Sequence, residues 1–277
     1  MSEPAIIPKI IYGTAWKKNQ TSEFVVGAVK AGFRAIDTAC QPKHYQEQGV
    51  GRALELLKAC DISRQDLFIQ TKFTPFAGQD PSQIPYDPAL SLGKQVLQSF
   101  AVSQRNLGTE VVDSLLLHSP LSDWKEFLEV WRAMESIHEA KGARFLGISN
   151  CYDLNQLKTL HRQALVKPAF LQNRFYAETA YDSQIRAWCL DKGIVYQSFW
   201  TLTGNPDVLR SSEITEIAAF HKKTPAQIFF RFVTQLGIVP LTGTRSEIHM
   251  REDLEIFDFD LSQDHQRKLE SILQNGN

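Results

Sequence analysis

The sequence contains few cysteines and has no excess of charge of either sign. Among its 277 residues there are four cysteines, and 30 basic residues against 31 acidic residues give a formal net charge of −1. The cysteines are scattered without Cys-x-x-Cys spacing, so we expect reduced thiols and no disulfide, zinc or other metal framework; they are Cys40, Cys60, Cys151 and Cys189. Without concentrated positive charge there is no electrostatic case for binding nucleic acid or an anionic membrane.

Long apolar runs and targeting segments are also missing. No stretch approaches the roughly 20 apolar residues that span a bilayer, and the first residues do not read as a secretory signal. No G-x-G-x-x-G motif follows a predicted strand, which disfavours a Rossmann nucleotide site. These absences predict a cytoplasmic protein of enzyme size that binds neither nucleic acid nor membrane, and nothing in the sequence requires more than a monomer.

Short β-branched or aromatic runs alternate with longer amphipathic segments along the whole chain. The predicted strands are Ile10–Tyr12, Ala35–Asp37, Phe68–Thr71, Asp113–Leu117, Phe145–Ile148, Phe170–Gln172, Val195–Ser198 and Ile238–Leu241. The predicted helices include Ser22–Ala31, Val50–Cys60, Pro88–Leu107, Trp124–Lys141, Leu154–Gln163, Ser183–Lys192 and Glu213–Leu236. This alternation implies parallel pairing, and eight units match an α/β fold of the (β/α)8 or TIM barrel type better than an open sheet.

The two ends of the chain and its glycines add further expectations. Ile6–Lys9 is predicted to be a strand of an N-terminal β-hairpin that covers the barrel bottom, and Leu261–Leu273 an extra C-terminal helix packed outside. No linker is visible between them, so residues 1–277 are expected to form a single domain. Glycines that precede predicted strands are expected to adopt the left-handed conformation at helix ends; they are Gly32, Gly108, Gly142, Gly193 and Gly237.

Polar side chains stand at the ends of three successive predicted strands. Asp37, Lys72 and His118 end these runs, and Tyr45 lies just beyond the first of them. In a parallel barrel the carboxyl ends of the strands converge on one mouth, where sites are built. Each residue has an ordinary alternative: a helix cap for Asp37, a solvated lysine, and a hydrogen-bonded core histidine. Taken together, the four residues predict a proton-donating site built on a phenol.

An ordered series of motifs closely resembles the aldo-keto reductase superfamily, from about Ile10 to Leu261. The motifs are Gly32-Phe33-Arg34-Ala35-Ile36-Asp37-Thr38-Ala39, Tyr45 with Glu47 and Val50-Gly51, Thr71-Lys72, Leu116-Leu117-His118-Ser119-Pro120, Gly147-Ile148-Ser149-Asn150 and Thr224-Pro225-Ala226-Gln227. The resemblance implies a (β/α)8 barrel that binds a nicotinamide cofactor and reduces aldehydes or ketones to alcohols.

The resemblance assigns a role to each of the four polar residues. Tyr45 would be the general acid, and His118 would hydrogen-bond the carbonyl oxygen of the substrate. Lys72 would favour the phenolate and lower the pKa of Tyr45, while Asp37 would keep the lysine charged and oriented.

The resemblance also implies a set of cofactor contacts. Ser149, Asn150 and Gln172 match positions that hydrogen-bond the nicotinamide carboxamide, and Phe199 stands where a tyrosine usually stacks on the ring. The remaining expected contacts follow the seventh and eighth strands and include Trp200, Leu202, Thr242, Gly243, Thr244 and Arg245.

The eighth-strand segment departs from the pattern of many relatives. Leu241 and Glu247 stand where those relatives have the lysine and arginine that hold the 2′-phosphate of NADP. The preference for NADP(H), with NAD(H) open, is therefore an expectation at the level of the family. We expect Arg245 to be the main contact of the 2′-phosphate, with Arg251 as the alternative.

Two other departures concern the proton donor and the substrate. The insertion Cys40-Gln41-Pro42-Lys43-His44 lengthens the connection between Asp37 and Tyr45, which leaves His44 as an alternative donor. Ser119 replaces a common tryptophan of the pocket wall, for which Trp124 is the expected substitute. The chain ends soon after its last helix, which predicts an open pocket for a small carbonyl substrate, lined by Trp16, Tyr45, Phe76, Tyr86, Trp124 and Trp200.

Two other functions stay open from the sequence. One is a nicotinamide-binding regulatory protein with little turnover, and the other is an unrelated barrel enzyme such as a sugar-phosphate isomerase. The intact set of four polar residues argues against the first of these, and binding of a nicotinamide cofactor would exclude the second.

Overall fold

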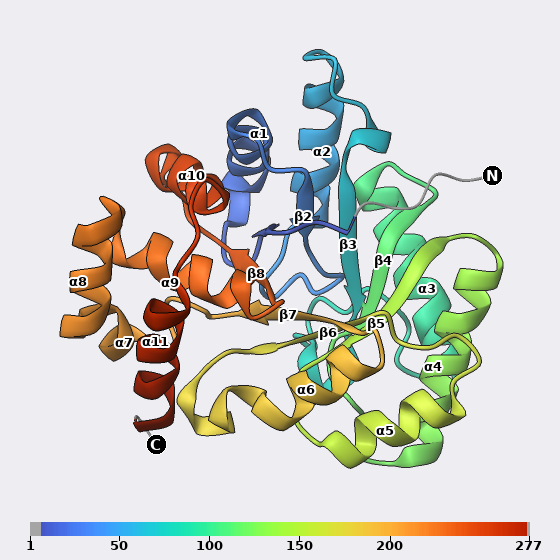
Figure 1. Ribbon diagram of the computed structural model, residues 1–277. Helices are drawn as coiled ribbons and strands as arrows, with labels where there is room; N and C mark the ends of the chain where they lie inside the picture. Colours follow the sequence, from blue (N-terminus) through green and yellow to red (C-terminus); the bar gives the residue numbers. More distant parts are fainter. Residues whose placement is uncertain (1–6, 276–277) are drawn as a thin grey trace, which may run out of the picture.

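Eight parallel strands close into a barrel that is ringed by helices in the computed structural model, which describes residues 7–275 (Figure 1). The strands are β1 Ile11–Gly13, β2 Ala35–Asp37, β3 Phe68–Phe73, β4 Val112–Leu117, β5 Ala143–Ser149, β6 Phe170–Arg174, β7 Val195–Phe199 and β8 Val239–Thr242. Each strand pairs with the next in sequence, and β8 pairs with β1 to close the ring. The predicted (β/α)8 barrel is confirmed, and every predicted strand is present.

The helices lie outside the barrel. Those in residues 7–275 are α1 Thr21–Ala31, α2 Glu47–Lys58, α3 Leu92–Leu107, α4 Trp124–Glu139, α5 Leu154–Gln163, α6 Ser183–Asp191, α7 Pro206–Arg210, α8 Ser212–His221, α9 Pro225–Gln235, α10 Glu247–Leu254 and α11 Gln263–Asn275. The extra C-terminal helix is thus present as α11. None of the helices in the described part of the chain is long and apolar enough to cross a membrane.

The prediction of one helix over Glu213–Leu236 is wrong, because the segment forms two helices. Lys222 adopts a left-handed conformation, with φ 54°, at the end of α8. Pro225 then occupies the first turn of α9, and the side chains of Thr224 and Gln227 form a capping box that starts this helix. The Thr-Pro-x-Gln pattern is itself a helix-start signal.

Two further expectations need correction. Ile6 lies outside the described residues, and residues 7–9 form no strand, so the predicted hairpin is not present in the part of it that the structure describes. Gly142 does not have a positive φ, because the left-handed residue of that turn is Lys141, with φ 64°. A Cβ at Gly142 would lie 2.8 Å from the Phe100 ring, so the glycine is required by space instead. The other four glycines have positive φ as predicted.

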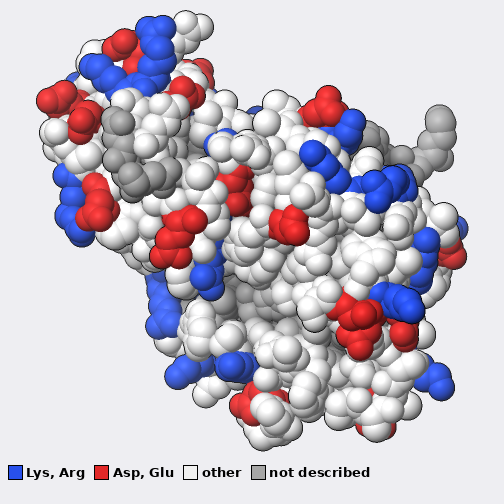
Figure 2. Space-filling model, turned by 90° about the horizontal axis from the view of Figure 1, so that it is seen from below, with Lys and Arg blue, Asp and Glu red and all other residues white. Residues whose placement is uncertain are grey.

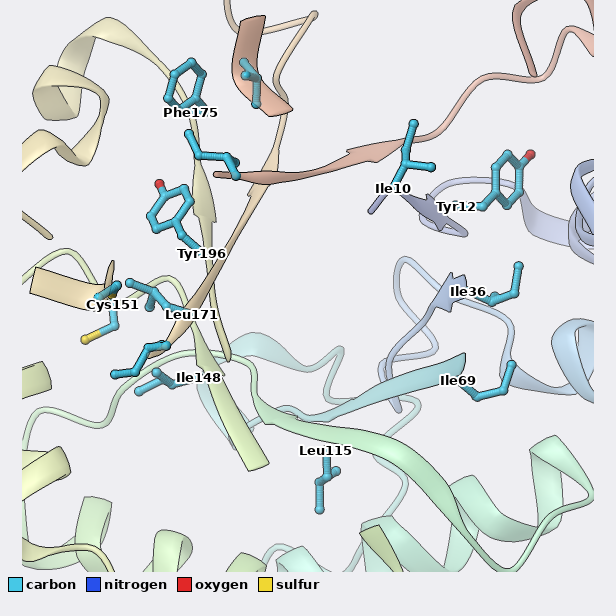
Figure 3. Packing of buried hydrophobic residues seen from close by; sticks show 14 of the residues in the cluster. Ile10, Tyr12, Ile36, Ile69, Leu115, Ile148, Cys151, Leu171, Phe175 and Tyr196 are labelled. Atoms are coloured by element: carbon cyan, nitrogen blue, oxygen red, sulfur yellow. The ribbon is translucent and has the colours of Figure 1, made fainter. Parts of the chain in front are cut away.

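Side chains alternate along each strand between the helices and the barrel interior. Ile36, Ile69 and Leu115 belong to the main apolar core, and Figure 3 shows them pointing from the strands toward the helices. The interior, toward the amino ends of the strands, is filled by a second apolar cluster, Ile11, Ala35, Phe68, Leu116, Phe170 and Val239. This apolar plug closes the barrel, so that polar interior residues can gather only at the other end.

Charges of both signs are mixed over the face of the molecule that Figure 2 shows. Acidic and basic side chains alternate there, and uncharged groups surround the hollow near the centre of the view. This agrees with the nearly balanced composition of 30 basic and 31 acidic residues.

Candidate active site

A buried ion pair joins β2 to β3 at the carboxyl ends of these strands. Lys72 Nζ lies 2.6 Å from Asp37 Oδ2 and 2.7 Å from Oδ1, and it also donates to the Thr38 carbonyl at 2.9 Å. Only 1% of Lys72 and 2% of Asp37 is exposed. Burial lowers the pKa of Lys72, and the Asp37 carboxylate opposes that effect. The pair is therefore a desolvated charge pair whose two members depend on each other.

Three glutamines form a polar layer inside the barrel and support Asp37. Gln70 and Gln172 each donate to Asp37 Oδ1, at 2.8 and 3.0 Å. Gln197 exchanges hydrogen bonds with Gln70 and accepts one from Gln172 at 2.9 Å. Sequence reasoning missed Gln70 and Gln197. The available signal was an amide two residues before Lys72, on the same face of an otherwise apolar strand.

Tyr45 reaches this ion pair in spite of the longer connection. The ammonium of Lys72 lies 5.1 Å from the centroid of the Tyr45 ring, and the His118 ring packs edge-on at 6.0 Å. Residues 41–45 turn back through backbone hydrogen bonds from His44 and Tyr45 to the Gln41 carbonyl. The structure thus gathers the four predicted site residues in one place.

The expected lowering of the pKa of Tyr45 is wrong, because the shift is in the opposite direction. Burial and the Asp37 carboxylate raise the pKa of Tyr45 above that of a free phenol. The larger cause is the burial of the ring, and the Asp37 carboxylate, which pairs with Lys72 at 2.6 Å, adds to it by disfavouring a second negative charge nearby. The phenol therefore stays protonated at neutral pH and is available as a proton donor.

His118 is held by a residue that sequence reasoning missed. Its Nδ1 lies 2.7 Å from Thr74 Oγ1, in the loop after β3. The Thr74 carbonyl accepts hydrogen bonds from Tyr86 Oη and Gln79 Nε2, at 2.9 and 3.2 Å. A Cβ at Gly78 would lie 2.8 Å from Thr74 Cγ2, so this loop packs closely on the threonine. Burial and the charge of Lys72 hold the pKa of His118 well below its usual range, so the imidazole is neutral.

The second histidine of this region, His44, ties the two loops together. Gln41 Nε2 donates to the Gly78 carbonyl at 2.6 Å, which leaves Gln41 Oε1 as the acceptor for His44 Nδ1 at 3.0 Å. The Trp16 ring covers His44, with centroids 4.0 Å apart. Burial lowers the pKa of His44, so it is neutral at neutral pH. His44 therefore donates from Nδ1 into the loop.

The aromatic residues expected around the substrate lie in different environments. Trp16, Phe76 and Trp200 are exposed by 56%, 50% and 51%, respectively. Tyr86 is buried, and its hydroxyl donates to the Thr74 carbonyl. It therefore positions the loop that holds Thr74 and does not face the open mouth. Trp124 donates its indole N–H to Gln163 at the end of α5, and its ring packs on Phe127, so it faces the outer helices.

The residues expected to contact nicotinamide form one hydrogen-bonded group. Asn150 Nδ2 donates to the His118 carbonyl at 2.8 Å, and Asn150 has a left-handed φ of 54°. Ser149 Oγ donates to the Gln172 carbonyl at 2.8 Å. Gln172 Nε2 is occupied by Asp37 and Gln197, whereas its Oε1 accepts no hydrogen bond from the described residues. Phe199 lies half-buried at the end of β7, which pairs with β6.

Two cations lie close together on the β1 and β8 side of the mouth. Lys17 is 2% exposed, donates to the Gly243 carbonyl at 2.8 Å and lies 4.8 Å above the Tyr12 ring. Burial and Arg245 lower the pKa of Lys17 to about 8. Arg245 donates to the Trp16 carbonyl at 2.6 Å. Neither cation forms an ion pair within residues 7–275.

The rest of the eighth-strand segment is held by its own contacts. Thr244 accepts a hydrogen bond from Tyr12 through its carbonyl, and Thr242 donates its hydroxyl to Asp253 at 2.6 Å. Arg251 pairs with Glu247 at 3.6 Å, which leaves it less available than Arg245. Leu202, after β7, packs against the main apolar core.

Sequence reasoning missed Lys17, although its place after the first strand was a usable signal.

Comparisons with known proteins show the family and the fold of this chain. The model of the Aldo/keto reductase family matches residues 9–205. The glyoxal reductase of Bacillus subtilis is 29% identical over 254 residues, which cover 92% of this chain and 84% of that protein. An aldo/keto reductase structure from Brucella melitensis superposes with a TM-score of 0.81 at 27% identity, covering 96% of this chain and 95% of that one.

A further solved structure contains the cofactor. It is a mutant of Gox0644 in complex with NADPH, which is 26% identical, has a TM-score of 0.80, and covers 96% of this chain and 89% of that one. The family match spans most of the barrel, including the strands that carry Asp37, Lys72 and Gln172 and the position of His118 just after β4. On these grounds the chain belongs to the aldo/keto reductase family.

Proposed function

We propose that this protein is an NAD(P)H-dependent carbonyl reductase in which Tyr45 is the proton donor. The observation that carries the proposal is the position of the Tyr45 ring, which lies beside the Lys72 ammonium and the His118 ring at the open end of a plugged barrel. The phenol, the buried ion pair and the neutral imidazole form the set of groups that carbonyl reduction requires.

Bound NAD(P)H would supply the hydride that reaches the carbonyl carbon of the substrate. The negative charge that then develops on oxygen must be met by a proton, and Tyr45 would donate it because its raised pKa keeps it protonated. Lys72, beside the ring, would stabilise the phenolate that remains. Asp37 would keep the lysine in place and protonated in a site where burial favours its neutral form.

His118 would orient the carbonyl oxygen from the other side. Because its pKa is lowered, it acts as a neutral hydrogen-bond donor rather than as an acid. If the Thr74 hydroxyl donates to Nδ1, the imidazole proton resides on Nε2. Thr74 would thus select the tautomer that can donate to the substrate.

The residues present fit a nicotinamide cofactor. Gln172 Oε1 has a free acceptor, Asn150 and Ser149 lie beside it, and Phe199 offers a π-face. Lys17 and Arg245 offer two cations at the β1 and β8 side that have no acidic partner among the described residues, which suits phosphate groups. We therefore favour NADP(H), although NAD(H) would use the same nicotinamide contacts.

The test of this function is the consumption of NADPH by the purified protein with small carbonyl compounds. Since the Bacillus subtilis relative is named a glyoxal reductase, the panel would include glyoxal and methylglyoxal beside benzaldehyde. We expect NADPH to be consumed in proportion to alcohol formed. Tight binding of NADPH without turnover of any substrate would favour a regulatory protein. Absence of binding of both NADPH and NADH would contradict the proposal altogether.

We expect Thr74→Val to lower kcat by roughly tenfold, because a lost hydrogen bond at a buried polar group costs about 1–3 kcal/mol. Valine keeps the shape of threonine but cannot bond His118 Nδ1, so the tautomer is no longer selected. The measurement is steady-state kinetics with benzaldehyde, together with NADPH titration. Thr74→Ser, which keeps the hydroxyl, should restore most of the activity. An equal loss in both variants would argue for a packing role of the methyl group.

We expect Arg245→Ala to weaken NADPH binding by about tenfold while sparing NADH, because a charge-assisted hydrogen bond to the 2′-phosphate would be lost. The matched control is Arg251→Ala, since Arg251 is already paired with Glu247. Dissociation constants for both cofactors, from fluorescence titration, decide the matter. Equal effects of Arg245→Ala on NADPH and NADH would contradict the assignment.

A further inference from the structure

An arginine that forms no ion pair with a described residue stands at the mouth of the barrel on the β6 side. Along β6 the interior positions are Phe170, which belongs to the apolar plug, Gln172, which belongs to the amide layer, and Arg174 at the carboxyl end. Arg174 lies opposite Phe199 in the register of β6 and β7. Because side chains alternate along a strand, Arg174 is the next interior residue above Gln172, on the open side.

The guanidinium of Arg174 lacks an acidic partner in the part of the chain that the structure describes. Its Nε is buried and makes no hydrogen bond, and neither terminal nitrogen donates to a described residue. The backbone N–H of Arg174 donates to the Tyr152 hydroxyl at 3.1 Å. Other arginines of the chain do form ion pairs, namely Arg64, Arg132, Arg144, Arg210, Arg231, Arg251 and Arg267. A buried donor without an acceptor is costly unless a ligand satisfies it.

An exposed tryptophan holds this guanidinium in place. The Arg174 Cζ lies 4.2 Å from the centroid of the Trp200 ring and 5.9 Å from that of Phe199. Trp200 is 51% exposed and has a left-handed φ of 58°, which a bulky residue rarely adopts. Stacking uses the face of the guanidinium and leaves its N–H edge available, and that planar edge matches the two oxygens of a carboxylate or phosphate.

This cation is separate from the pair formed by Lys17 and Arg245. Those two residues follow β1 and β8, whereas Arg174 ends β6, and β7 lies between β6 and β8 in the ring. The Tyr152 hydroxyl, which accepts a hydrogen bond from the Arg174 backbone N–H, also donates to Asn150 Oδ1 at 3.4 Å. Asn150 in turn donates to the His118 carbonyl. Arg174 is thus linked to the residues around the candidate active site rather than to the outer surface.

We propose that Arg174, stacked on Trp200, is an oxyanion-binding residue at the mouth of the barrel. The inference rests on the proposed reductase function, because it takes the mouth to be the place where cofactor and substrate meet. The ligand is a pair of phosphate or carboxylate oxygens. One source is a carboxylate on the carbonyl substrate, and the other is the pyrophosphate of the cofactor.

The experiment compares Arg174→Ala and Arg174→Lys with the wild type on two matched aldehydes, 4-carboxybenzaldehyde and its methyl ester, with NADPH. The control is Arg210→Ala, a solvent-exposed arginine paired with Asp207. If the ligand is the substrate carboxylate, KM for the acid rises by about ten- to hundredfold in Arg174→Ala, as expected for a lost charge-assisted hydrogen bond. KM and kcat for the ester stay within about twofold, and the lysine variant is intermediate because it keeps the charge without the planar edge.

If the ligand is the cofactor pyrophosphate, the dissociation constant of NADPH rises by that factor instead, and both aldehydes are affected alike. An unchanged dissociation constant for NADPH together with an unchanged KM for the acid would overturn the proposal. A fall in kcat for both aldehydes, with the affinity for NADPH and for the acid unchanged, would overturn it as well. Should Arg174→Ala fail to fold, the same constants are measured for Arg174→Lys and Trp200→Phe. Calorimetric titration with NADPH and with 4-carboxybenzaldehyde, each alone, tests the role of Arg174 even if the protein shows no turnover. The absence of turnover would count against the reductase function only.

Discussion

Tyr45→Phe is expected to lower the turnover of an aromatic aldehyde by about 10²–10⁴-fold, the usual contribution of a positioned general acid. The variant removes the one hydroxyl of a ring that lies 5.1 Å from the Lys72 ammonium and packs edge-on against His118. Phenylalanine keeps the ring and its packing, so the loss should fall on kcat while the dissociation constant of NADPH stays unchanged. The measurement is NADPH consumption at saturating cofactor, wild type beside the variant.

The informative comparison is with His44, whose Nδ1 is bonded to Gln41 and whose ring is covered by Trp16. His44→Gln should leave kcat within a few-fold of the wild type, because the low pKa of His44 makes it a poor acid at neutral pH. Turnover that survives in Tyr45→Phe and disappears in His44→Gln would reverse the assignment. The longer connection of residues 40–44 would then have exchanged one donor for the other.

Asp37→Leu is expected to destabilise the protein by about 3–5 kcal/mol, because it leaves the buried Lys72 ammonium without its counterion. The same substitution removes the acceptor of Gln70 and Gln172 in the amide layer. Lys72 is 1% exposed, so solvent cannot replace the lost carboxylate. Urea unfolding at neutral pH, followed by circular dichroism, measures the change in the free energy of unfolding.

A double variant separates the cost of the stranded charge from that of lost packing. Asp37→Leu with Lys72→Met removes both charges, and we expect it to recover a large part of the lost stability although it is inactive. The matched surface control is Asp207→Ala, since Asp207 and Arg210 form a pair whose side chains are 94% and 70% exposed, and we expect little change there. If the double variant were no more stable than Asp37→Leu, the unpaired lysine would not be the cause of the loss.

Two features of the molecule differ from what the sequence predicted, the helix between residues 213 and 236 and the pKa of Tyr45. The helix break between α8 and α9 was missed although Thr224, Pro225 and Gln227 carry a start signal, because the apolar periodicity on both sides was given more weight. The predicted lowering of the pKa of Tyr45 was wrong for a different reason. The pKa of Tyr45 depends on how deeply the ring is buried and on how near the Asp37 carboxylate lies, neither of which is a local property of the sequence.

The alternation of strand and helix patterns was enough for the barrel and for its polar mouth, because periodicity and strand ends are local features and parallel pairing then forces those ends together. Tertiary contacts alone decided which side chains share a hydrogen bond. Gln70 meets Gln197, which is 127 residues away, and Thr74 meets His118 across 44 residues. Lys17 and Arg174 are ordinary cations in the chain, and only the folded barrel leaves both without an acidic partner among the described residues. Partners and burial of this kind are set by the packing of distant segments, which no window of sequence contains.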